Sequence, residues 1–260
     1  MSIKVAVHGA FGKMGQMVIA AVGREPDLSL VGGIDLKASG SSMDTASGRI
    51  PCGTDPETIL RETHPEVLVD FSVASAVMPL AIAAAAHRVH LVSGTTGLSA
   101  DELKKIDELA RTSGIGAVIA ANFALGAVVM MHLAEIAARY FDYAEIIEEH
   151  HEQKRDAPSG TALSTAKLMA EARRQRFSEP KQEEPSASRG QNTEGIAIHS
   201  VRLPGLVARQ EVLFGALGQT LSVKHEAISR ECYMPGVITA IKMVGQLQGL
   251  VSGLDKLLGL

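Results

Sequence analysis

The feature that most constrains this chain is a glycine-rich turn near its N-terminus. An apolar, β-branched run over residues 3–7 leads into Gly9, Gly12 and Gly15, and a helical pattern follows over residues 12–22. Glycines at this spacing permit a tight turn, a close approach of the backbone to a pyrophosphate, and close packing of helix on strand. The start of the helix offers free N–H groups and a positive dipole end to phosphates. The turn therefore predicts a dinucleotide-binding βαβ unit.

A carboxylate after the next apolar run supports this prediction. Asp35 follows residues 28–34 and lies 20 residues after Gly15, the spacing expected of a carboxylate that binds the adenosine ribose hydroxyls. Such a carboxylate favours NAD over NADP because it repels the 2′-phosphate, although Lys13 and Lys37 can offset this repulsion. We expect NADH and/or NADPH as the cofactor, with NADH favoured.

The first half of the chain alternates short apolar runs with amphipathic stretches. This alternation predicts an α/β domain of Rossmann type, in which right-handed crossovers build a parallel sheet. The expected strands cover residues 3–7, 28–34, 67–71, 89–92 and 116–121, and the expected helices cover 12–22, 74–87 and 99–112. Ser99 and Glu102 form a capping-box pattern at the start of the third helix.

The alternation of strands and helices ends near Asn122, which we take as a domain boundary. Strands with few helices between them predict a second domain of α+β type with an open mixed or antiparallel sheet. Its strands are expected at residues 144–149, 195–203, 210–216 and 220–225, and its helices at 124–140 and 159–174. Residues 177–193 are polar, with Pro180 and Pro185, and predict an exposed loop. Residues 234–251 read as one further helix.

Composition excludes several classes of protein. Lys and Arg number 25 and Asp and Glu number 29, which gives a net charge of −4. This balance does not indicate the excess of positive charge that is typical of nucleic-acid-binding proteins. The longest Ala-rich run, residues 81–86, is far shorter than the ~20 apolar residues of a membrane helix. Two cysteines, Cys52 and Cys232, and a start without a secretory pattern predict a reducing compartment. We expect the cytoplasm, or the plastid stroma in a plant.

A second glycine-rich loop follows the fourth expected strand and consists of Ser93, Gly94, Thr95, Thr96 and Gly97. In an open parallel sheet, the loops at the carboxyl ends of the strands line the ligand crevice. Two glycines and two threonine hydroxyls there suit contact with a nicotinamide ribose or amide. An ordinary turn between strand and helix explains the segment equally well.

A candidate carboxylate site lies at the start of the helix expected over residues 159–174. Ser159 is a good N-cap residue, and Gly160 and Thr161 then leave backbone N–H groups at the helix N-terminus. Lys154 lies a few residues upstream and adds positive charge. The segment predicts that an anionic substrate binds at a helix start.

Two adjacent histidines, His150 and His151, precede this segment. Adjacent residues of a strand point to opposite faces, so only one of them can readily face a given ligand. A histidine there can move a proton near neutral pH. No His or Cys pair at metal-ligand spacing accompanies them, so we predict no metal. A solvated strand end followed by a capped helix is the alternative.

At this segment the chain resembles a known family. His150, His151, Lys154 and the run Asp156-Ala-Pro-Ser-Gly-Thr-Ala162 are similar to the signature of the dihydrodipicolinate reductases. The resemblance covers the whole chain. The other similar stretches are residues 7–15, 69–72, 93–97, 120–123, 198–202 and 225–230. Ala208-Arg209-Gln210 stands where the family often has a Gly-acid-His stretch, so we assign it no role.

The resemblance implies a two-domain enzyme that forms a homotetramer. Residues 1–121 and 231–260 would bind the dinucleotide, and residues 122–230 would bind the substrate and form the core of the oligomer. The implied reaction belongs to lysine and diaminopimelate biosynthesis. It reduces 4-hydroxy-tetrahydrodipicolinate, a small cyclic dicarboxylate, to tetrahydrodipicolinate with NADH or NADPH and with loss of water.

The resemblance also implies roles for individual residues. His150 would donate or accept the proton and Lys154 would be a second donor. The residues implied to bind substrate are His151, Ser159, Gly160 and Thr161. Those implied to line the cofactor are Gly9, Ala10, Phe11, Gly12, Lys13, Met14, Gly15, Asp35, Phe71, Gly94, Thr95, Thr96, Ala120, Asn122 and Phe123.

Two other functions fit parts of this pattern. A nicotinamide enzyme of the aspartate or homoserine dehydrogenase type would share the glycine turn, because one fold hosts many reactions. A regulator that senses the dinucleotide without turnover would share it too, but the His150 and Lys154 pair argues against such a protein.

Overall fold

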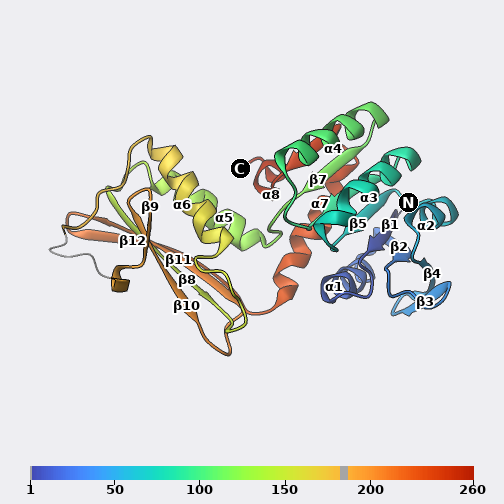
Figure 1. Cartoon of the computed structure of the whole chain (residues 1–260), viewed down its shortest axis with the longest axis horizontal. Coiled ribbons are helices and arrows are strands. Elements are labelled where there is room, and N and C mark those ends of the chain that lie inside the picture. Colours follow the sequence, from blue (N-terminus) through green and yellow to red (C-terminus); the bar gives the residue numbers. More distant parts are fainter. Residues whose placement is uncertain (1, 182–186) are drawn as a thin grey trace. The chain divides into compact units, whose positions relative to one another are not determined.

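The computed structural model describes residues 2–181 and 187–260. The chain forms two compact units (Figure 1): the first comprises Met1–Phe123 and Tyr233–Leu260, and the second comprises Ala124–Cys232. These boundaries lie within two residues of those expected from the sequence. Pro185, which belongs to the expected polar loop, lies outside the described residues.

The first unit is built on an eight-stranded sheet with the order β13-β7-β6-β5-β1-β2-β4-β3. Every neighbouring pair is parallel except β3 and β4, which are antiparallel. The strands are β1 (Ile3–His8), β2 (Leu28–Ile34), β3 (Ser42–Thr45), β4 (Gly48–Gly53), β5 (Val67–Asp70), β6 (His90–Ser93), β7 (Gly116–Ile119) and β13 (Gly249–Ser252). All residues of β5 and β7 are buried, as expected for central strands covered on both faces. The predicted Rossmann-type parallel sheet is confirmed.

One helix of the first unit, over residues 100–113, begins and ends at residues with clear local signals. Ser99 and Glu102 form both bonds of the predicted capping box, and Gly114 ends that helix in the left-handed region with φ +69°. The helices are α1 (Lys13–Val22), α2 (Pro56–Thr63), α3 (Ala74–His87), α4 (Ala100–Ser113), α7 (Met234–Val244) and α8 (Leu254–Leu258).

Three expectations from the sequence need correction. The helix expected over residues 234–251 ends as α7 at Val244, and β13 then forms the sheet edge beside β7. Gly249, with φ +89°, turns the chain into this strand, and a short apolar run cannot distinguish strand from helix by periodicity alone. The sequence predicted no element between residues 36 and 66, where β3, β4 and α2 lie. The expected loop 177–193 contains a 3₁₀ turn, η1 (Ala187–Arg189), and β9 (Gln191–Thr193).

The second unit is a five-stranded mixed sheet with the order β12-β11-β8-β10-β9. Among the strand pairs that the structure describes in this sheet, β8 and β10 are parallel and the others antiparallel. Its remaining strands are β8 (Tyr143–His150), β10 (Ile196–Arg202), β11 (Ala208–Ala216) and β12 (Gln219–Ala227), and its helices are α5 (Leu125–Ala137) and α6 (Gly160–Arg173). The predicted open mixed sheet is confirmed.

Both helices of the second unit pack on one face of its sheet (Figure 1). Side chains at alternate strand positions, among them Ile146, Val212 and Phe214, form a core with α5 and α6. The intervening residues, such as Ile147 and Leu213, point to the opposite face and are half-buried. We call this opposite side the outer face.

Candidate active site

The glycine turn between β1 and α1 is closed by backbone contacts that only glycine allows. Gly9 has φ +77°, and a Cβ there would lie 2.5 Å from the carbonyl oxygen of Phe71. A Cβ at Gly15 would clash with the carbonyl of Gly9. Gly12 supplies no side-chain cap. The first N–H groups of α1, from Lys13 onward, therefore have no acceptor within the helix. Such a helix start is chemically suited to an anion such as a pyrophosphate.

The carboxylate of Asp35 contacts this turn directly. Its Oδ2 accepts a hydrogen bond from the backbone N–H of Phe11 at 2.9 Å, and its Oδ1 accepts one from Lys37 N at 2.9 Å. The carboxylate thus lies beside the glycine turn at the end of β2, where ribose hydroxyls could donate to its remaining lone pairs.

The ends of the central strands bring further expected cofactor residues together. The Phe71 ring covers Gly94 so closely that a Cβ at Gly94 would clash with it. The rings of Phe71 and Phe123 have centroids 5.8 Å apart. Gly9 contacts the backbone of Phe71 from the other side. Four residues from separate parts of the sequence therefore meet at the carboxyl ends of the strands, where open α/β sheets bind ligands.

Beneath these residues, Asp70 connects three strand ends by hydrogen bonds. Its buried carboxylate accepts from His8 Nδ1 at 2.7 Å, Ser72 Oγ at 2.6 Å, and Ser93 Oγ and Thr95 Oγ1 at 2.7 Å each. Burial alone would raise the pKa of Asp70, but these hydrogen bonds lower it below its ordinary value. The Thr95 hydroxyl is thus bonded inside the protein, while Thr96 is exposed.

The remaining expected cofactor residues belong to the same unit. Ala10 is fully buried, and its N–H donates to the carbonyl of Ile34 at 3.1 Å. Its side chain thus packs in the core, and its N–H is bonded within the protein. Ala120 is buried behind the strand ends, Asn122 follows it at intermediate exposure, and Met14 lies on the first turn of α1.

In the second unit, the start of α6 has the predicted geometry. The Ser159 hydroxyl accepts a hydrogen bond from Ala162 N at 3.2 Å and caps the helix. The N–H groups of Gly160 and Thr161, in its first turn, have no intrahelical acceptor. A Cβ at Gly160 would meet none of the described atoms within 4 Å, so this end is open to an anion.

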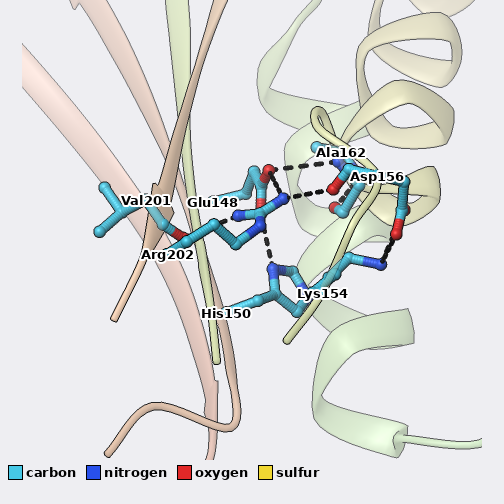
Figure 2. Close-up of polar contacts among 8 residues, drawn as sticks. Glu148, His150, Lys154, Asp156, Ala162, Val201 and Arg202 are labelled. Atoms are coloured by element: carbon cyan, nitrogen blue, oxygen red, sulfur yellow. Dashed lines mark hydrogen bonds and ion pairs between the residues drawn. The ribbon is translucent and has the colours of Figure 1, made fainter. Parts of the chain in front are cut away.

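His150, the last residue of β8, lies close to this helix start (Figure 2). Its Nδ1 is 2.6 Å from Oε2 of Glu148, and Oε1 of Glu148 accepts from Ser159 N at 3.2 Å. One carboxylate therefore contacts both the histidine and the cap of α6. His151 follows the strand at intermediate exposure, and its carbonyl accepts from Lys154 N at 3.1 Å.

Arg202 of β10 completes this cluster. Its two terminal nitrogens donate to Glu148 at 3.0 and 2.8 Å, and Nη2 also donates to the carbonyl of Asp156 at 2.7 Å. Burial opposes the charge of Glu148, but the bonds from His150 and Arg202 outweigh it and lower its pKa to about 2. Glu148 is therefore ionised at neutral pH.

Lys154 is engaged by a neighbouring carboxylate. Its Nζ donates to both carboxylate oxygens of Asp156, at 2.8 and 2.7 Å, and Figure 2 shows its side chain directed toward Asp156. The bond from Lys154 also lowers the pKa of Asp156. The structure thus places Lys154 in the same loop as expected, with its charge paired.

Sequence reasoning missed Glu148, Asp70 and the role of Arg202. A signal for Glu148 was present, because Ala144, Ile146, Glu148 and His150 alternate along one strand and must share a face. A carboxylate in line with core residues needs buried partners. No local pattern indicates Arg202, which lies 54 residues away.

Two further properties concern the described part of the chain. No group of three or more His, Cys, Asp or Glu side chains among those residues could hold a metal ion. Within the same residues, every helix is too short or too polar to cross a membrane.

Comparison with known proteins assigns both units. Residues 3–123 match the family model described as "Dihydrodipicolinate reductase, N-terminus", and residues 126–258 match "Dihydrodipicolinate reductase, C-terminus". A 4-hydroxy-tetrahydrodipicolinate reductase of Dehalococcoides mccartyi is 54% identical over 260 residues, with 99% of both chains covered. One of Moorella thermoacetica is 46% identical over 262 residues, with 99% of this chain and 98% of that one covered.

Solved structures give the same assignment. The dipicolinate-bound dihydrodipicolinate reductase of Paenisporosarcina sp. TG-14 matches with a TM-score of 0.90 and 37% identity, over 98% of this chain and 99% of that one. An amine dehydrogenase of Mycobacterium smegmatis, at 16% identity and a TM-score of 0.66, shares the fold alone. The family models and the relatives together span this chain, and it belongs to the dihydrodipicolinate reductase family.

Proposed function

We propose that the protein is an NAD(P)H-dependent 4-hydroxy-tetrahydrodipicolinate reductase of lysine and diaminopimelate biosynthesis. One hydride and one proton enter the substrate and one water leaves, which gives tetrahydrodipicolinate and the oxidised nucleotide. The observation that supports the proposal is the placement of His150 beside the open start of α6, since Glu148 contacts both His150 Nδ1 and Ser159 N. A proton donor and an anion site are thus adjacent.

The residues at the glycine turn fit a nicotinamide dinucleotide. The N–H groups at the start of α1 suit the pyrophosphate, and Asp35 suits the ribose hydroxyls. Bound there, the reduced nicotinamide supplies the hydride. We infer that both NADH and NADPH are used and that NADH is preferred. The Asp35 carboxylate repels a 2′-phosphate, whereas Lys13 and Lys37 reduce this repulsion.

The second unit supplies the groups for a dicarboxylate. The N–H groups of Gly160 and Thr161 bind one substrate carboxylate, and Lys154 and His151 bind the substrate beside them. His150 donates the proton from its Nε2 as charge develops in the conjugated ring, and Lys154 is the second donor. The relative from Paenisporosarcina binds dipicolinate, itself a cyclic dicarboxylate.

Family membership sets aside the two other functions considered from the sequence. The curated relatives are named reductases of one substrate, and they align over the length of the chain. Neither the dehydrogenases of small amino acids nor a dinucleotide sensor without turnover fits this assignment.

A coupled assay tests the proposal. The purified protein is mixed with the synthase that makes 4-hydroxy-tetrahydrodipicolinate from pyruvate and aspartate semialdehyde, and oxidation of NADH and of NADPH is followed separately. We expect rapid oxidation that requires both synthase substrates, with a higher kcat/KM for NADH. A protein that binds NADH but oxidises neither cofactor under these conditions contradicts the proposal.

We further propose a homotetramer in the cytoplasm. The outer face of the second unit's sheet carries half-buried apolar side chains, such as Ile147 and Leu213, opposite the helix-covered face. A second copy of this sheet could cover them. The cytoplasm holds the reduced nucleotide that the reaction consumes. No nucleic acid or membrane partner forms part of the proposal.

A further inference from the structure

The side chain of Glu148 is completely buried. None of the roles described so far explains why a charged carboxylate occupies this buried position. We propose that Glu148, neutralised by Arg202, is a positioning residue that fixes the orientation of His150 and the start of α6 together. This inference rests on the proposed reductase function, because it assigns Glu148 to the same reaction.

The geometry uses both oxygens of the carboxylate. Oε2 lies 2.6 Å from Nδ1 of His150 and accepts from Arg202 Nη1 at 3.0 Å. Oε1 accepts from Arg202 Nη2 at 2.8 Å and from Ser159 N at 3.2 Å. Figure 2 shows the side chains of Glu148, His150 and Arg202 converging from two neighbouring strands. The carboxylate of Glu148 therefore fixes the distance between His150 and the start of α6.

These contacts select one form of the imidazole. An ionised carboxylate can only accept hydrogen bonds, so Nδ1 of His150 must carry a proton and donate a hydrogen bond to Glu148. The bond at Nδ1 persists whether the ring is neutral or charged. The proton that reaches the substrate therefore comes from Nε2, the nitrogen turned away from Glu148, and the carboxylate stabilises the imidazolium before transfer.

Arg202 limits the electrostatic cost of this arrangement. A lone buried carboxylate would repel a dicarboxylate substrate at the start of α6, and its two-pronged pairing with Arg202 cancels that charge. The same guanidinium bonds to the carbonyl of Asp156 and so holds the loop that carries Lys154. In the loop after His150, Lys154 and Asp156 pair with each other.

Stability alone is a weak reason for such a cluster. A buried ion pair loses most of its Coulomb gain to desolvation, and apolar residues of similar volume often stabilise a fold equally well. A role in orienting His150 explains why a carboxylate occupies this core position of β8.

The test compares Glu148→Gln with Glu149→Gln in the coupled assay. Glu149 is the matched control because it lies next in the strand, points to the outer face and pairs with Arg209 at 3.1 Å. Partners that orient a functional histidine of a metal site contribute about 10- to 100-fold, and we expect a similar loss of kcat in Glu148→Gln. KM should change less than threefold, because the groups that would contact the substrate remain in place. Glu149→Gln should keep kcat and KM.

A folded Glu148→Gln variant with the kcat of Glu149→Gln overturns the inference, as does one whose KM rises as much as its kcat falls. Absence of turnover by the unmodified protein contradicts the proposed function instead, so the two failures are distinguishable. If Glu148→Gln does not fold, nuclear magnetic resonance of the unmodified protein with ¹⁵N-labelled histidine decides the question. The neutral ring of His150, assigned by its loss in His150→Gln, should carry its proton on Nδ1. A neutral ring protonated on Nε2 alone refutes the positioning role.

Discussion

His150 and Lys154 are each held by a carboxylate, but the two carboxylates differ in burial. The side chain of Glu148 is 0% exposed, whereas that of Asp156 is 59% exposed. An exposed ion pair contributes about 0–1 kcal/mol, so Lys154 can exchange Asp156 for a substrate carboxylate at little cost. His150 keeps its partner throughout. Replacing His150 and replacing Lys154 should therefore change kcat and KM in different ways.

We expect His150→Gln to lower kcat by about 10²- to 10⁴-fold with a modest change in KM, because it removes a proton donor. Lys154→Ala should lower kcat and also raise KM, because it removes a cation that binds the substrate. Steady-state kinetics in the coupled assay measure both effects. His199→Gln, which alters a histidine paired with Glu145 on another part of the sheet, serves as the control. Full kcat in His150→Gln at neutral pH would show that the acid is misassigned.

At the scale of elements, two helix starts are arranged for anions in different ways. Helix α1 begins after Gly12 without a side-chain cap, so its first N–H groups point out of the helix end. Helix α6 begins after Ser159, whose hydroxyl accepts a hydrogen bond from Ala162 N. The N–H groups of Gly160 and Thr161 are then left for a ligand. The cap of α6 therefore stabilises the helix and would also orient the carboxylate site that we propose there.

Ser159→Ala tests this double role. Loss of an N-cap costs about 1 kcal/mol, which for a chain of this size lowers Tm by about 2–4 °C. We expect a several-fold increase in the KM for the substrate as well, with little change in the KM for NADH. Ser99→Ala is the matched control, because it removes the cap of α4 in the other unit and should lower stability alone. Equal substrate KM values in the two variants would show that the α6 start does not bind substrate.

At the scale of the whole molecule, the sheet of the second unit has two dissimilar faces. One face packs against α5 and α6, and the other presents Ile147, Leu213 and charged side chains. Half-buried apolar side chains on a broad sheet are typical of an interface between subunits. The oligomer we propose would bury them.

We expect Leu213→Glu to break the tetramer into smaller species, because it places a charge within the proposed interface. Light scattering after size-exclusion chromatography measures the mass. Leu217→Glu changes a fully exposed leucine in the turn between β11 and β12 and should leave the mass unchanged. A Leu213→Glu protein that remains tetrameric would place the interface elsewhere.

The candidate site could be predicted from the sequence where its signals are local. The glycine turn, Asp35 and the Ser159 cap each depend on residues within one βα or βαβ unit, and the structure shows Asp35 beside the glycine turn and Ser159 capping α6. Glu148 could have been found from its strand alternation with His150. Lys154 lies in the loop before α6, and its pairing with Asp156 depends on side-chain geometry that the sequence does not show.

The sequence by itself determined the fold class and most of the longer helices and strands, because turns, caps and apolar periodicity act between residues a few positions apart. It could not determine β13, whose short apolar run becomes a strand only where the edge of β7 pairs with it. Nor could it place Arg202 against Glu148, since 54 residues separate them and only the parallel pairing of β8 with β10 makes them neighbours. Hydrogen bonds between distant strands and the burial of charge are properties of the assembled sheet, so only the tertiary structure decided them.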